Sequence, residues 1–193
     1  EGEGDPISLA EARTTTFPRR KVFLVSTPTI ESLSRINKEW LASDQRRYHV
    51  PCPHCGHQQH LTWDNLRWPK DRPEEAVYHC ADCGAGIEEH HKTRLLAAGQ
   101  WVATYPERPV AGFHINGLYT PTGLGYTWGE LAALWIESSK DPARIKTFVN
   151  LRLGEVVADP NEKIDADDLA SRASPYQVRS IPPGCLLITA GID

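Results

Sequence analysis

The sequence predicts a mixed α/β fold that contains a small cysteine-rich β-ribbon. Two segments of the 193-residue chain, 52–55 and 80–83, each begin and end with a cysteine. A short continuous apolar run over 21–25 has the pattern of a buried strand in a parallel sheet. The segment 127–154 opens with a helix-capping pattern and ends with a glycine, as helices commonly do. We therefore expect helices and at least one buried strand around the ribbon.

The two cysteine pairs are the most specific feature of the sequence. Each pair is followed directly by a glycine, Gly56 or Gly84, which allows a tight turn that points both thiolates toward one centre. Two such turns supply four thiolates, the ligand set of structural zinc, with Zn–S distances of about 2.3 Å. We therefore predict a structural zinc ribbon with the ligands Cys52, Cys55, Cys80 and Cys83.

Two other interpretations of the cysteines remain open. Cys-Pro-His-Cys at 52–55 is also a thiol–disulfide exchange motif, but that motif would end a strand and open a helix, whereas 56–63 has the pattern of strand or loop. A redox site would also leave the pair at 80–83 without a role. Plain disulfides are typical of secreted proteins, and we expect no secretion signal here. Because four thiolates complete the shell, we expect the nearby histidines at the surface or behind the ligands: His54, His57, His60 and His79.

Composition and charge limit the class of protein. A hydrophobic content of 40% and a charged content of 24% are ordinary for a soluble protein, and no apolar run approaches the roughly 20 residues that a membrane span needs. We expect no membrane association and a reducing cytoplasm. The net charge of −4 argues against nucleic-acid binding over the whole surface, but leaves local basic patches such as 19–21 and 46–47. The chain lacks methionine and starts at Glu1, so we expect it to be the middle of a longer protein.

The N-terminal part predicts a helix over about 6–15, started by Asp5 and Pro6, and then the buried strand over 21–25. The strand ends in the hydroxyl-rich segment 26–29. Hydroxyls at the carboxyl end of a buried strand lie where open α/β sheets bind ligands, which would make the segment a phosphate-sensing loop. Spacing alone favours Thr29 as a helix cap, because it precedes an apolar stripe on one helical face: Ile30, Leu33, Ile36 and Trp40.

The C-terminal half predicts two consecutive helices and a final strand. A short helix over 92–99, a strand over 101–105 and an ordered loop over 106–126 come first. Thr127 and Glu130 fit a capping box that opens a helix, a second helix starts at Asp141-Pro142, and Gly154 ends it. The first of these helices is expected to bury Leu131, Leu134 and Trp135, and the second Ile145, Phe148 and Val149.

The apolar run 185–192 reads as a buried strand that ends in Asp193. A carboxylate at the end of a core strand is a common position for a magnesium ligand in nucleases, although one carboxylate does not establish a site. A separate hypothesis concerns the basic pair before the ribbon. If the ribbon is a DNA- or protein-binding module, Arg46 and Arg47 would contact phosphates.

The ordered set of motifs resembles the large terminase subunit of lambda-type tailed phages, the GpA family. The resemblance runs in family order over most of the chain, and its segments are Val25-Ser26-Thr27-Pro28-Thr29, Asp44-Gln45-Arg46-Arg47-Tyr48, the two cysteine pairs, Ile87-Glu88-Glu89-His90-His91-Lys92, Gly112-Phe113-His114-Ile115, Lys146-Thr147-Phe148-Val149-Asn150 and Leu153-Gly154-Glu155. Such proteins are ATP-driven motors that package viral DNA into a procapsid and carry an endonuclease that cuts the concatemer.

The resemblance implies four parts. They are the end of a P-loop-type ATPase domain over 1–45, the zinc ribbon and its flanks over 46–105, an aromatic loop and helical connector over 106–182, and the first strand of a ribonuclease-H-like nuclease over 183–193. It implies ATP and magnesium as cofactors of the parent protein, together with double-stranded DNA, a terminase small subunit and a portal as partners of an oligomeric motor in the host cytoplasm.

The resemblance also assigns roles to single residues. Ser26 and Thr27 would sense the nucleotide phosphate and couple hydrolysis to movement, and Asp193 would be the first metal-binding carboxylate of the nuclease. The sequence contains no Gly-x-x-x-x-Gly-Lys-Ser/Thr loop to cradle ATP phosphates. We therefore expect that this chain alone neither hydrolyses ATP nor cuts DNA.

Overall fold

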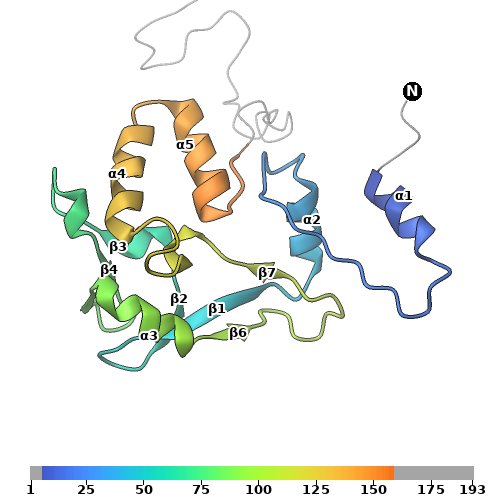
Figure 1. Cartoon of the computed structure of the whole chain (residues 1–193), viewed down its shortest axis with the longest axis horizontal. Coiled ribbons are helices and arrows are strands. Elements are labelled where there is room, and N and C mark those ends of the chain that lie inside the picture. The colour runs from blue at the N-terminus through green and yellow to red at the C-terminus, as the bar shows by residue number, and fades with distance from the viewer. Residues whose placement is uncertain (1–5, 159–193) are drawn as a thin grey trace, which may run out of the picture. The chain divides into compact units, whose positions relative to one another are not determined.

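In the computed structural model of the chain, residues 6–158 are described, and they combine helices with short strands (Figure 1). This confirms the mixed α/β class. The predicted strand over 185–193, with Asp193, lies outside the described residues, as does Asp5. None of the helices between residues 6 and 158 has the length and apolar composition needed to span a bilayer.

The first sheet is built around one central strand, β1 (Arg46–Pro51). Strands β2 (Gln58–His60) and β6 (Gln100–Val102) pair with it in antiparallel orientation, and β7 (Phe113–His114) pairs with its first residues in parallel. The predicted strand over 101–105 is therefore confirmed in a shorter form. Part of the expected loop over 106–126 supplies a strand to the same sheet.

The second sheet is small and antiparallel. Its order is β3 (Leu66–Arg67), β4 (Val77–His79) and β5 (Gly86–Ile87), with Tyr78 opposite both Leu66 and Ile87. These three side chains are almost fully buried, because they face inward from neighbouring strands. The two sheets together form the ribbon that carries the cysteines.

The helices are short, and those after residue 34 lie around the sheets (Figure 1). The α-helices are α1 (Pro6–Arg13), α2 (Arg35–Ala42), α3 (Lys92–Ala97), α4 (Trp128–Ser138) and α5 (Pro142–Phe148). Single 3₁₀ turns occur at Trp63–Asn65, Pro73–Glu75, Glu89–His91 and Gly117–Tyr119, and a π-helical turn, Val149–Leu153, follows α5. The helices predicted over 6–15 and 92–99 are confirmed with slightly earlier ends.

The capping pattern predicted for α4 is confirmed. The Glu130 backbone N–H donates to Thr127 Oγ1 at 3.1 Å, and the Thr127 backbone N–H donates to Glu130 Oε2 at 2.8 Å. Asp141 caps α5, and Gly154 ends the helical segment in the left-handed conformation with φ 65°. Each of these signals involves residues close in sequence, so the local pattern decides the outcome.

One core connects the ribbon with the helical segment after it. Trp63 of the ribbon packs against Trp135 of α4 and Phe148 of α5, with ring centroids 5.5 and 5.0 Å away. The Tyr119 hydroxyl accepts the Leu61 N–H and donates to the Tyr48 carbonyl, both at 2.6 Å. The fully or nearly fully buried apolar side chains are Val50, Cys52, Leu61, Leu66, Ala76, Tyr78, Cys80, Ile87, Leu95, Leu118, Tyr119, Trp128, Leu131, Ala132, Phe148 and Leu153.

The strand predicted over 21–25 is wrong. The segment is irregular, and the side chains of Phe23 and Val25 are 84% and 79% exposed. An apolar run forms a buried strand only where neighbouring strands satisfy its backbone and cover both faces. Among the described residues, no strand pairs with it.

The helix cap predicted at Thr29 is also wrong. Helix α2 starts after Ser34, whose Oγ accepts the Asn37 N–H at 3.4 Å. The reason is a long-range pairing, in which Ile30 forms a parallel bridge with Val157. Because Ile30 is held in this bridge and residues 31–33 form a turn, Ile30 and Leu33 of the expected apolar stripe precede the helix.

A candidate metal centre and a polar pocket

The four cysteine sulfurs lie together at one end of the ribbon. All four are within 4.8 Å of one another, with Cys52 Sγ 3.9 Å from Cys83 Sγ and Cys55 Sγ 3.8 Å from Cys80 Sγ. Four sulfurs in a tetrahedral shell with metal–sulfur distances of about 2.3 Å are about 3.8 Å apart. The arrangement therefore has the ligand number and spacing to hold one four-coordinate metal ion.

Two matching turns position these sulfurs. The first connects β1 to β2 and the second connects β4 to β5, so each cysteine pair is held between two paired strands. Gly56 and Gly84 have φ values of 77° and 70°, and their N–H groups donate to the carbonyls of Cys52 and Cys80 at 2.9 and 3.1 Å. A residue with a Cβ would be strained at either position, which explains the glycine after each pair.

The local electrostatics favour a thiolate at Cys80. Burial by itself opposes the charged form, but hydrogen bonds from the backbone N–H groups of Cys83 and Asp82 lower the pKa of Cys80 to about 6. Burial raises the pKa of Cys52. Without a metal, Cys52 therefore favours the neutral thiol and Cys80 the thiolate. A bound cation would shift Cys52 toward the thiolate as well, because coordination favours the thiolate of every ligand.

A buried glutamine fixes the second turn to the first. Gln59 of β2 is 4% exposed, and its Oε1 accepts the Ala81 N–H at 2.8 Å, next to Cys80. Its Nε2 is buried and has no acceptor among the described residues. Sequence reasoning did not identify Gln59, since nothing in its neighbourhood marks a residue that acts across the ribbon.

Two of the neighbouring histidines lie within hydrogen-bond distance of backbone carbonyls and not among the sulfurs. His54 Nε2 lies 3.0 Å from the Gly86 carbonyl, and His79 Nδ1 lies 3.1 Å from the Gly84 carbonyl. Within residues 6–158, no histidine joins the sulfur group. His60 is half-buried on β2, where burial first and then the charge of Arg47 lower its pKa to about 4.

Arg46 and Arg47 lie on opposite faces of β1, because successive side chains of a strand alternate. Arg46 Nε donates to Asp44 Oδ2 at 2.7 Å, and Asp44 Oδ1 accepts the Gly112 N–H at 3.0 Å. Burial opposes ionisation of Asp44, but these bonds hold its pKa below the usual value. Arg47 instead has its guanidinium 5.7 Å from the centroid of the Trp40 ring.

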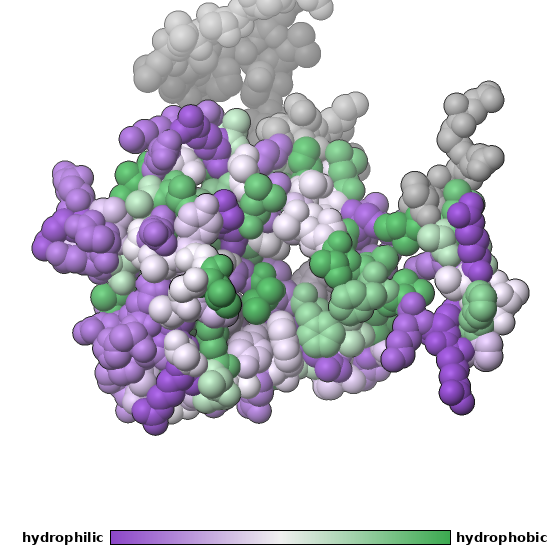
Figure 2. Space-filling model, viewed as in Figure 1, coloured by the Kyte–Doolittle hydropathy of each residue, from purple (hydrophilic) through white to green (hydrophobic). Residues whose placement is uncertain are grey.

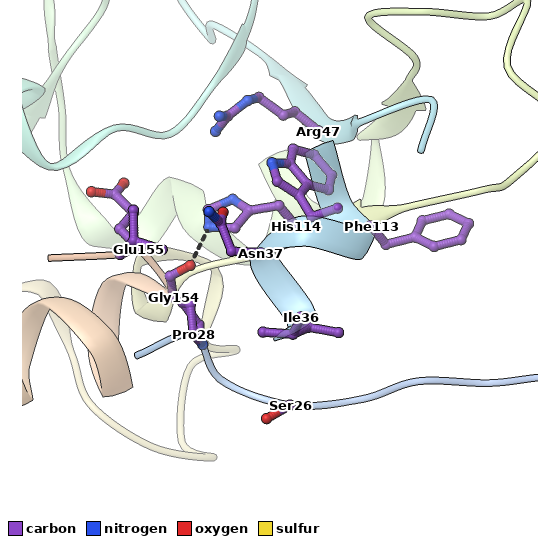
Figure 3. A pocket seen from close by; sticks show the side chains of 11 residues that line it. Ser26, Pro28, Ile36, Asn37, Arg47, Phe113, His114, Gly154 and Glu155 are labelled. Carbon is purple, nitrogen blue, oxygen red and sulfur yellow. Dashed lines mark hydrogen bonds between the residues drawn. The ribbon is translucent and has the colours of Figure 1, made fainter. Parts of the chain in front are cut away.

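A pocket of about 320 Å³ lies on the Arg47 side of the sheet (Figure 3). Figure 3 shows Asn37 of α2 and His114 of β7 close together at its centre, with Arg47 above them and Glu155 to the left. His114 Nε2 lies 3.1 Å from the Gly154 carbonyl, the bond drawn in the figure. The complete lining is Ser26, Pro28, Ile36, Asn37, Trp40, Arg47, Phe113, His114, Gly154, Glu155 and Val156.

The residues predicted as nucleotide sensors are placed differently from one another. Ser26 lines this pocket, whereas Thr27 is exposed and does not. Both belong to the irregular segment that replaces the predicted strand. Asp193 lies outside the described residues. The structure thus brings Ser26 and Arg47 to one pocket, while the four cysteines form a separate group.

Comparisons with known proteins agree on one family. A family model described as phage terminase large subunit gpA, ATPase domain, matches residues 1–101, and one described as terminase large subunit gpA, endonuclease domain, matches residues 110–193. The chain is 31% identical to the terminase large subunit of Enterobacteria phage P21 and 29% identical to that of Escherichia phage lambda. Both alignments cover all of this chain but 33% of the relative, so the chain spans about a third of their length. No solved structure matches it.

Proposed function

The chain belongs to the GpA family of phage terminase large subunits, and we propose that it is the part of such a subunit that joins the ATPase region to the nuclease region. The complete protein would translocate viral DNA at the expense of ATP and cut the concatemer. The observation that carries the proposal is the order of the two matches, with an ATPase model ending at residue 101 and an endonuclease model beginning at residue 110.

The cysteine group is proposed to bind zinc in a structural role. Four thiolates with no open position are typical of structural zinc, whereas a catalytic zinc keeps a site for water. When bound, zinc supplies apparent binding free energy on the order of 10–16 kcal/mol to a small domain. The sulfur spacings of 3.8 and 3.9 Å support this assignment, and a two-cysteine redox site has no need of the second pair.

The finer division of the chain follows the same premise. Residues 1–45 would complete a P-loop-type ATPase domain, 46–105 would be the zinc ribbon, 106–182 the connector and 183–193 the first strand of a ribonuclease-H-like nuclease. Ser26 and Thr27 would couple nucleotide state to movement, a role supported for Ser26 by its place in the pocket. Asp193 would hold Mg²⁺ with nuclease carboxylates elsewhere in the parent protein.

The proposed partners are those of a packaging motor. Double-stranded DNA would be the substrate, a small subunit and a portal would be protein partners, and the working form would be an oligomer in the host cytoplasm. The two arginines proposed for DNA lie on opposite faces of β1 and have different partners. Within residues 6–158 no carboxylate lies within ion-pairing distance of Arg47, while Arg46 is paired with Asp44.

The experiment that tests the function uses the full-length protein. Wild type should hydrolyse ATP and cut duplex DNA with Mg²⁺, and Asp193→Asn should lose cutting while it keeps ATP hydrolysis. Elemental analysis of the 193-residue chain should give about one zinc per molecule, as a closed four-thiolate shell requires. The 193-residue chain itself should do neither reaction. Intact cutting by Asp193→Asn, or thiol–disulfide reductase activity in a zinc-free chain, would contradict the proposal.

A further inference from the structure

One face of the first sheet changes from core to an exposed aromatic surface along β1. Val50 is fully buried on this face, Tyr48 is partly buried, and Arg46 is at the end that the core does not cover. Trp101 of β6 lies opposite Tyr48, and Phe113 of β7 lies opposite Arg46. Side chains of paired residues project from the same face, so these rings collect at the uncovered end.

The rings form a connected set. The centroids of Trp101 and Phe113 are 5.0 Å apart with the planes at 84°, and Tyr48 lies 5.1 Å from Trp101. Despite these contacts, Trp101 is 38% exposed and Phe113 is 51% exposed. Figure 3 shows the Phe113 ring directed away from Arg47 and His114, and Figure 2 shows apolar side chains gathered over the region of α2 and β7.

Arginines accompany the exposed rings. The Arg46 guanidinium lies 5.3 Å from the Phe113 centroid, and the nearby Arg108 guanidinium lies 3.8 Å from the Tyr105 centroid. Asp44, which pairs with Arg46, has a side chain only 4% exposed, whereas that of Arg46 is 39% exposed. The Arg46 guanidinium therefore stays partly open to solvent although it is paired with the buried Asp44 carboxylate.

We propose that Trp101, Phe113 and Arg46 form a surface that binds single-stranded DNA, with bases stacked on the rings and the guanidinium beside the phosphates. The proposal rests on the DNA-packaging function proposed above. It adds that the bound DNA is single-stranded and says which surface binds it. Single strands offer unstacked bases, and stacking on aromatic side chains tolerates any sequence. In a duplex the base faces are already covered, so exposed rings would contribute little.

Charge complementarity favours nucleic acid as the occupant. Aromatic residues and arginine are also enriched at protein–protein interfaces, so the salt series of the test decides between the two, because phosphate contacts weaken as salt rises. Here an arginine lies against a ring of the surface itself, the combination used on single-strand binding grooves, where arginine adds a cation–π contribution. The polyanionic backbone of DNA complements these arginines, and a single strand supplies both the anion and the planar rings.

The test measures binding of a short fluorescein-labelled oligothymidine to the zinc-loaded 193-residue chain by fluorescence anisotropy, over a series of salt concentrations. We expect Trp101→Leu and Phe113→Leu to weaken binding at least about fivefold each, the effect of losing one stacked base. Trp101→Phe should restore much of the affinity because it restores a ring. Binding of a matched duplex should be weaker than binding of the single strand.

Tyr126→Leu is the matched control. Tyr126 is 38% exposed and has the Arg152 guanidinium 4.5 Å from its ring, and among the described residues no ring contact joins it to Trp101 or Phe113. It should bind as wild type does, and zinc content and near-ultraviolet circular dichroism confirm the fold of each variant. Wild-type affinity in both leucine variants, an equal loss in Tyr126→Leu, or preference for duplex would overturn the proposal. Cutting of duplex by the full-length protein would still stand in each case, so the two failures are distinguishable.

Discussion

A buried ion pair between Lys92 and Glu89 connects the ribbon to helix α4. Removing the charge of Glu89 should lower the free energy of unfolding far more than removing the charge of Lys92. Lys92 is 1% exposed, and its Nζ lies 3.0 Å from Glu89 Oε1 and 5.3 Å from the Trp128 ring centroid. Glu89 Oε2 also accepts the backbone N–H of Trp128, the first residue of α4, at 2.7 Å. Glu89 thus serves a buried cation and a helix N-terminus together.

Glu89→Gln keeps the shape of the side chain but removes its charge, so the Lys92 ammonium remains buried without a counter-ion. Breaking a buried pair in this way costs about 3–5 kcal/mol. Lys92→Met removes the buried charge and leaves Glu89, which is 24% exposed and keeps its bond to Trp128, so we expect a cost below about 1 kcal/mol. In a domain of this size about 3 kcal/mol lowers the melting temperature by roughly 6–12 °C.

The assay is urea unfolding of the zinc-loaded chain followed by circular dichroism, with four variants. Glu89→Gln should be strongly destabilised, Lys92→Met weakly, and the double variant should recover to near Lys92→Met. Glu88→Gln is the control, because its 71% exposed carboxylate lies 3.1 Å from Nδ1 of exposed His90, and the loss of such an exposed pair should cost below about 0.5 kcal/mol. Equal losses in Glu89→Gln and Lys92→Met would refute the reasoning, since they would mean that packing rather than charge holds this junction.

Three further predictions concern single positions. Cys80→Ser should lower bound zinc and unfold the ribbon locally, measured by elemental analysis and hydrogen exchange, and unchanged values would contradict a metal-held ribbon. His60, with a folded pKa of about 4, is neutral in the fold but takes up a proton near pH 6.5 when unfolded, so its contribution to stability falls by about 1–2 kcal/mol as the pH drops from 6.5 to 4. In denaturant titrations, His60→Gln should lose less unfolding free energy than wild type between pH 6.5 and 4. Equal losses in the two proteins would exclude this role of His60. Gly112→Ala should cost more than about 2 kcal/mol in thermal unfolding, because the new Cβ would overlap Ser43 Oγ, and a neutral result would show that this contact can yield.

Sequence reasoning succeeded where the deciding residues are close together. The capping box at Thr127 and Glu130 is complete within four residues, and Gly154 ends its helix by its own backbone preference. The cysteine group was predictable for a similar reason. Each pair lies on a local turn, and only the proximity of the two turns had to be inferred. These features need no knowledge of distant partners.

The failures have the opposite cause. Thr29 has every local feature of a cap, but Val157 pairs with the backbone around it and moves the helix start to Ser34. Arg46 and Arg47 look equivalent as a basic pair, yet the pleat of β1 sends one to Asp44 and the other to the pocket. Asp44 belongs to a resembling segment, but its structural contact could not be predicted, because its bond to the Gly112 N–H joins segments far apart in sequence.

The same long-range contacts connect the two regions that the family models match. β1, within the ATPase match, pairs with β7, within the endonuclease match, and Gly112 donates to buried Asp44 across the same boundary. The Glu31 N–H donates to the Val157 carbonyl at 3.2 Å, and the Val157 N–H donates to the Thr29 carbonyl at 3.3 Å. Separating the two regions within residues 6–158 would break all of these bonds at once. The backbone at Thr29 and Glu31, in the ATPase match, is therefore bonded directly to the backbone at Val157, in the endonuclease match.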